Sequence, residues 1–294
     1  MSGDPRRAVA LLLLPLLLPS PPARSPPPDG EWIAVERYPN GSQFARGKVL
    51  GDPDDGEFLE GEWTFWYPGG EVLAVGSYRR GRRDGPRGES SVPAAGREGV
   101  WTFWYESGQK RQEAEYRDGR EDGRFLSWFA DGQPEAQGRY AAGKKEGRWT
   151  LWHPNGARKF SGVFAGGREE GPVTFWHDNG QKMLQGTFQS GMREGRFVVW
   201  DSAGRRRSEG DYREDLKDGT WTYWDGEGRQ VRTEIYDRGA LIREKGGGPT
   251  AASGAQPSGP AAEASASEET SIGPAAPAAP SPPAPLPPGN ARGP

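Results

Sequence analysis

Residues 147–156 of this chain read Gly-Arg-Trp-Thr-Leu-Trp-His-Pro-Asn-Gly, and the pattern returns along the sequence in 24-residue steps. Each copy has a Gly, in most copies an aromatic residue two places later, a Trp three places after that, and a second Gly. A fixed period indicates a repeat architecture, in which each unit buries its apolar surface only against its neighbours. The opening glycines are Gly61, Gly99, Gly123, Gly147, Gly171, Gly195 and Gly219.

One copy has the chemistry of a β-hairpin followed by a connector. Residues 101–105 are a β-favouring run without a helical period, residues 106–108 form a turn, and residues 109–116 form a second run. The turn glycine recurs in every copy, where a positive φ is expected, and Asp215 replaces the connector glycine once. An acid precedes each opening glycine, and we interpret these acids as turn residues, not catalytic carboxylates. The acids are Glu60, Glu98, Asp122, Glu146, Glu170, Glu194 and Asp218.

Side chains alternate across a strand, so the aromatic residues of a repeat divide between two faces. Trp101 and Phe103 share one face, which we expect to be packed, while Thr102 and Trp104 share the other. The sequence therefore predicts an all-β fold, an elongated array of about seven 24-residue antiparallel β-hairpin repeats with disordered termini. About 14 strands at about 4.8 Å each would make a sheet roughly 65 Å long.

The pattern of residues 147–156 resembles the bacterial variant of the MORN repeat, Gly-x-Trp-x-x-Trp/Tyr-x-x-Asn-Gly. The resemblance is close over residues 61–243 and loose over 30–60. Proteins with this variant are often described as similar to YwqK-type antitoxins. The resemblance implies an elongated β-hairpin scaffold for protein or lipid contacts, without catalysis of its own.

Composition divides the chain into a folded array and two different ends. Residues 1–25 have an arginine pair followed by a short apolar stretch, which predicts an export signal, and residues 26–60 combine a linker with a possible degenerate first repeat. The repeat domain covers 61–243, with an insertion at 85–98 that interrupts the period. Residues 244–294 are rich in Pro, Ala and Gly and are predicted to be disordered.

The bulk composition excludes several classes of function. The chain has 294 residues, no Cys and a net charge of -3, which rules out a thiolate zinc site and argues against a nucleic-acid partner. We find no nucleophile elbow, phosphate loop or zinc helix. The sequence therefore predicts no enzyme, no cofactor and no metal site.

The Trp that closes each first strand is the leading candidate for a binding surface, because flat amphipathic side chains anchor interfaces. The alternative is that these Trp pack against each other or against the late aromatic residue of the paired strand, and it is the better supported of the two because a structural role repeats in every unit. The row is Trp66, Trp104, Trp128, Trp152, Trp176, Trp200 and Trp224.

Three further features are weaker candidates. His153 and His177 occupy equivalent positions, which is more typical of a tolerant rim than of metal ligands. Two arginine clusters would meet an acidic partner or keep turns soluble, and the second interpretation is favoured. The insertion at 85–98 is either a specificity loop or a neutral bulge. The clusters are Arg79, Arg80, Arg82, Arg83 and Arg87, and Arg205 to Arg207.

These observations favour an exported, bacterial, non-catalytic repeat scaffold that binds a protein partner through an aromatic sheet face and edge loops. The alternatives are an antitoxin-like or immunity-like protein and a membrane-surface module. The slight net negative charge weighs against anionic-lipid binding. If the leader is not a functional signal, the protein would be cytoplasmic.

Overall fold

The computed structural model describes residues 31–52, 56–82 and 92–246, which form one open sheet of 17 strands. The prediction of an all-β fold built from antiparallel hairpins is confirmed. In chain order the strands are β1 (Glu31–Arg37), β2 (Gln43–Asp52), β3 (Gly56–Trp66), β4 (Val72–Arg82), β5 (Arg97–Trp104), β6 (Lys110–Arg117), β7 (Arg120–Trp128), β8 (Pro134–Ala141), β9 (Lys144–Trp152), β10 (Arg158–Ala165), β11 (Arg168–Trp176), β12 (Lys182–Gln189), β13 (Met192–Trp200), β14 (Arg206–Arg213), β15 (Leu216–Trp224), β16 (Gln230–Asp237) and β17 (Ala240–Lys245).

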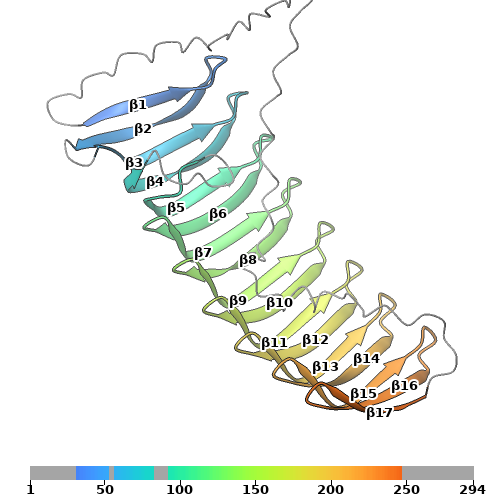
Figure 1. The fold of residues 1–294 in the computed structure, drawn as a ribbon. Coiled ribbons are helices and arrows are strands. Elements are labelled where there is room, and N and C mark those ends of the chain that lie inside the picture. The colour runs from blue at the N-terminus through green and yellow to red at the C-terminus, as the bar shows by residue number, and fades with distance from the viewer. Residues whose placement is uncertain (1–30, 53–55, 83–91, 247–294) are drawn as a thin grey trace, which may run out of the picture.

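Each strand pairs antiparallel with the strands before and after it in the sequence, so the sheet is a continuous meander. Figure 1 shows the hairpins stacked along one axis, with the hairpin turns along one edge and the tight connectors along the other. At about 4.8 Å per strand the described sheet is on the order of 80 Å long. It is longer than predicted because β1 and β2 precede the first clear repeat.

The hairpin turns have the conformation expected from the sequence. In the turn after β5, the Gly108 backbone N–H donates to the Tyr105 carbonyl at 2.9 Å, and Gly108 has a φ of 83°. This is a short loop that ends in a left-handed residue, a conformation that glycine adopts without steric cost. The turn glycine of every copy has a positive φ, as predicted.

The interpretation of the acid and opening glycine as turn residues is wrong. Both lie inside the first strand of each hairpin, and from β6 onward the connector between hairpins is only two residues long. In β9, residues 147–149 stand opposite Gly138 alone, because the ladder steps from Gln137–Thr150 to Arg139–Glu146. Gly147 has a φ of 67° at this bulge. A bulge in every hairpin bends the strand and increases the twist of the sheet.

From β6 onward the connectors are two-residue loops with positive φ at both positions. Ala142 and Gly143, for example, have φ values of 48° and 80°. This is the type I′ geometry, whose twist matches that of the flanking strands. Asp215, which replaces the connector glycine once, has a φ of 68°, as its tolerance of left-handed backbone predicts.

The aromatic residues predicted to be packed form a single buried cluster on one face of the sheet, which we call the packed face. Trp63, Trp101 and Trp149 are each at most 1% exposed, although the described strands form one sheet without a second. Burial is possible because each indole lies over a glycine of the preceding strand. A Cβ on Gly138 would collide with the Trp149 ring, and Gly76 and Gly210 stand in the same relation to Trp101 and Trp221.

Some predictions concern parts of the chain that the structure does not describe. The export signal at 1–25, residues 26–30, residues 53–55, the first half of the insertion (85–91) and residues 247–294 lie outside the described residues. Among the residues that are described, none forms a helix long and apolar enough to cross a membrane.

Candidate functional site

The seven Trp of the predicted binding surface lie on the opposite side of the sheet, which we call the second face. Each is the last residue of the first strand of its hairpin, from Trp66 at the end of β3 to Trp224 at the end of β15. All seven are half-buried, whereas the Trp of the packed face are fully buried. The second face therefore presents a periodic, partly accessible aromatic row that runs along the turn edge.

Cations from the preceding hairpin account for part of this burial. The Lys110 ammonium lies 5.9 Å from the centre of the Trp128 ring, and the Arg158 guanidinium lies 5.2 Å from that of Trp176. Such contacts combine attraction to the ring with coverage by the alkyl stem of the cation.

The interpretation that this Trp row packs against the late aromatic residues is wrong. The late aromatic residues face the other way: Tyr140 lies 5.0 Å, centre to centre, from Trp149 on the packed face. Among the described residues, no aromatic pair includes a Trp of the second-face row.

The backbone of the same Trp row is held by a ladder of hydrogen bonds between repeats. In four of the seven copies, the residue after the second-face Trp reaches the Trp carbonyl of the next repeat. The Tyr67 hydroxyl donates to Trp104 O at 2.9 Å, and the Tyr105 hydroxyl donates to Trp128 O at 2.8 Å. The other three copies have Phe129, Asp201 and Asp225 at this position. His153 and His177 occupy the same position, and the Nε2–H of His153 donates to Trp176 O at 2.9 Å. The two histidines are rim residues with one ring nitrogen already engaged.

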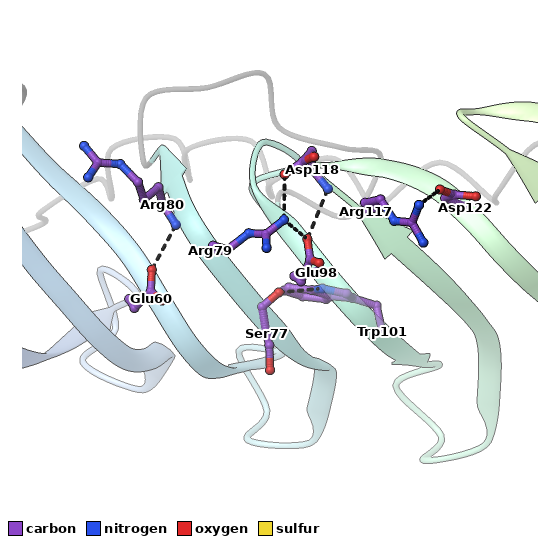
Figure 2. A network of polar contacts seen from close by, with 9 residues as sticks. All are labelled: Glu60, Ser77, Arg79, Arg80, Glu98, Trp101, Arg117, Asp118 and Asp122. Atoms are coloured by element: carbon purple, nitrogen blue, oxygen red, sulfur yellow. Dashed lines mark hydrogen bonds and ion pairs between the residues drawn. The ribbon is translucent and has the colours of Figure 1, made fainter.

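The acids before the opening glycines form a second ladder, at the connector edge. Six of the seven accept a hydrogen bond from the backbone N–H of the residue 20 positions later, which for all but Glu60 is the first residue of the next connector. Asp122 instead pairs with Arg117 at 3.3 Å. Figure 2 shows Glu60 with Arg80 N at 2.9 Å and Glu98 with Asp118 N at 3.2 Å. Glu146, Glu170, Glu194 and Asp218 act in the same way. Their carboxylates are therefore used to fix the left-handed residue of the connector.

The arginine clusters are largely engaged in local pairs where they are described. Arg79 contacts both Glu98 and Asp118, at 3.3 and 3.1 Å, as Figure 2 shows. Arg205 pairs with Asp201 inside its own turn at 3.0 Å. These contacts support the structural interpretation of the clusters. Arg83 and Arg87 lie outside the described residues.

The described end of the insertion packs into the core. Val92 is fully buried, and the Tyr78 hydroxyl donates to Pro93 O at 2.6 Å. Arg97, 5% exposed, donates through Nε to Pro93 O at 3.0 Å and through Nη2 to Val92 O at 2.9 Å. Its guanidinium also lies over the Trp101 ring. Residues 92–97 thus seal the packed face at the point where the 24-residue period is interrupted.

Sequence reasoning missed a stripe of ionisable residues on the packed face beside the connectors. The stripe carries one residue per repeat: Arg97, Glu121, Lys145, Glu169, Arg193 and Lys217. The Lys145 ammonium lies 4.8 Å from the centre of the Trp149 ring, and burial lowers the pKa of Lys145 to about 8. Burial likewise raises the pKa of Glu169. The 24-residue spacing was visible in the sequence, but only the register places these groups over aromatic rings.

Comparisons with known proteins find a family match for three of the repeats. Three segments match the family model described as MORN repeat variant, at residues 59–80, 97–118 and 169–190. No curated protein matches the chain. Among solved structures, the chain is 11% identical to part of a chain in the crystal structure of TcdB2–TccC3, with a TM-score of 0.20, over 73% of this chain and 14% of that one. A protein of unknown function from Bacteroides fragilis is 6% identical with a TM-score of 0.09, over 74% of this chain and 94% of that one.

Similarities at these TM-scores do not indicate a shared fold or function. The chain spans only 14% of the length of the first of these structures. What the architecture defines is an open, single-layer β-hairpin repeat scaffold. Three of its repeats match the MORN repeat variant, as the resemblance of the sequence pattern predicted.

Proposed function

We propose that the protein is a non-catalytic scaffold that binds a protein partner through the second face of its sheet. The observation that carries the proposal is the asymmetry between the two faces. The aromatic residues of the packed face are buried without a second layer, while all seven Trp of the second face stay half-accessible. Partly exposed Trp in a regular row is typical of interfaces.

Two observations support a role without catalysis. The opening acids accept hydrogen bonds from connector backbone, and the two histidines donate to carbonyls of the next repeat. These are the residue types that would serve as acid, base or ligand, and here they hold neighbouring repeats together.

The proposal is tested by affinity capture with the full chain from the envelope and soluble fractions of the cells that produce it. We expect a stoichiometric partner, retained by the wild type and lost when Trp128, Trp152 and Trp176 are replaced by Leu. Leu keeps apolar area but removes the ring, so far-ultraviolet circular dichroism should be unchanged. A chain that retains nothing under mild conditions contradicts the proposal.

The same fractionation tests localisation. We propose that the protein is exported, on the basis of the composition of residues 1–25. A reporter fused after Ser25 should leave the cytoplasm, and a reporter that stays there contradicts export.

A further inference from the structure

The central part of the second face carries exposed cations that no ion pair explains. Arg124 on β7, Arg139 on β8 and Arg148 on β9 are all exposed, as are Arg158 on β10 and Lys182 on β12. We call these five residues the central basic band. Among the described residues, none of the five lies in an ion pair. Trp128, Trp152 and Trp176 end β7, β9 and β11, so the strands that carry the band also carry these three Trp. Strands β7 to β12 lie in the middle of the array (Figure 1).

Folding does not account for this arrangement. Arg124 stands directly opposite Arg139 in the ladder between β7 and β8, and like charges in that position destabilise a sheet. Glu146 stands opposite Arg139 on the other side, but its carboxylate accepts the Gly166 N–H at 2.9 Å. A cluster that costs stability in the free protein is a candidate for recognition.

In the flanking hairpins, the cations equivalent to Arg158 and Lys182 each pair with a carboxylate. Lys110 pairs with Glu113 at 2.9 Å on one side of the band, and Arg206 pairs with Glu209 at 2.9 Å on the other. At the positions of Glu113 and Glu209, the central hairpins carry Gln137, Ser161 and Gln185. Arg158 and Lys182 therefore lack the carboxylate that pairs with Lys110 and Arg206 in the flanking hairpins.

We propose that the central basic band binds a short acidic segment of a protein partner. In this arrangement the carboxylates of the segment meet Arg124, Arg139 and Arg148, and its apolar side chains contact Trp128 and Trp152. Arginine forms bidentate pairs with carboxylates, and Arg and Trp dominate the energetics of interfaces. This inference rests on the proposed function and specifies the chemistry of the partner.

The limits of the band favour a discrete segment over an extended polyanion. Successive Trp of the row are two strands apart, about 10 Å, so three of them span about 20 Å, the length of an extended peptide of about six residues. The opening acids, such as Glu146 and Glu170, border the band at the connector edge, and Glu113 and Glu209 border it along the array. A membrane surface or a nucleic acid would meet those acids as well as the cations.

The experiment measures binding of a fluorescein-labelled hexaglutamate peptide to the full chain by anisotropy at low and moderate salt. The test variant is Arg124→Gln with Arg139→Gln and Arg148→Gln. The control is Arg79→Gln with Arg117→Gln and Arg213→Gln, which removes the same charge from arginines that are already ion-paired. We expect the test variant to bind at least about tenfold more weakly and the control to stay within about twofold of wild type.

Equal weakening in both variants would show a general charge effect and overturn the proposal. So would absence of peptide binding, or tighter binding of phosphatidylserine vesicles or a single-stranded DNA oligonucleotide than of the peptide. Capture of a partner that the test variant retains and the Trp variant loses would overturn this inference while leaving the proposed function standing. Because the test substitutions remove like-charge contacts, the variant is expected to unfold at the same or a higher temperature than wild type.

Discussion

At the scale of single residues, glycine has two separate physical roles in each repeat. The glycine in the middle of the second strand, such as Gly138, leaves space for an indole from the next hairpin. Ala114 takes this position where the facing residue is Phe125 and no Trp has to be accommodated. The glycines of the bulges and turns instead provide positive φ.

Gly138→Ala tests the first role. The added Cβ would collide with the Trp149 ring, so we expect a loss of about 1–3 kcal/mol in the free energy of unfolding, measured by urea denaturation. Gly226→Ala is the control, since its Cβ would meet nothing closer than Arg207 at 3.7 Å. Equal effects of the two substitutions would contradict this account of the packed face.

Ala142→Gly tests the second role. Ala142 has a φ of 48°, which costs an L-residue with a Cβ but not glycine, so the variant should gain about 1 kcal/mol in stability. The same substitution at Ala165, near the end of β10, should lose about 0.5–1 kcal/mol. Thermal unfolding of the two variants should therefore shift in opposite directions.

At the scale of the element, each hairpin is joined to the next along both of its edges. The turn edge carries hydrogen bonds from Tyr and His rings to Trp carbonyls, and the connector edge carries hydrogen bonds from backbone N–H groups to the opening acids. Between these edges, buried cations lie over the aromatic rings of the packed face. A repeat is therefore defined by its contacts with its neighbours as much as by its own sequence.

Lys145 on β9 makes stability depend on pH. Burial lowers its folded-state pKa to about 8, below its ordinary value, so between these two values the unfolded chain binds more protons than the folded one. Stability should therefore rise with pH from about 7 to about 9.5, by on the order of 1 kcal/mol. Above pH 10 the trend should reverse, because burial raises the pKa of Tyr116 to about 12. Tyr116 then loses its proton at a lower pH in the unfolded chain than in the folded one, which favours unfolding.

Lys145→Met provides the comparison. Met keeps the apolar stem without a titrating group, so urea unfolding of the variant should depend less steeply on pH between 7 and 9.5. Some slope should remain, because burial also lowers the pKa of Lys217. A wild type and a variant with the same slope in that range would exclude Lys145 as its origin.

At the scale of the whole molecule, each described strand pairs only with its neighbours in the sequence. Removing one complete repeat should therefore leave a folded, shorter array. Deletion of residues 195–218 joins Glu194 directly to Gly219, so an acid still precedes the opening glycine of the next repeat.

We expect this deletion to retain the β-sheet signal in circular dichroism and to shorten the particle by about 10 Å in small-angle scattering. Deletion of only residues 195–206 removes one strand and reverses the direction of every strand that follows. That variant should unfold or aggregate. Loss of folding in both variants would contradict the nearest-neighbour description.

The sequence by itself determined the class of the fold, because a 24-residue period of aromatic runs and turn glycines is compatible with little besides stacked β-hairpins. It also determined which aromatic row is packed, because the period of a strand is two.

Only the tertiary structure decided the roles that depend on which strand lies beside which. It placed the opening acids within strands, because their partners lie 20 residues away in the next connector. It also placed Arg124 opposite Arg139, since ladder register brings together residues that are 15 apart in the sequence.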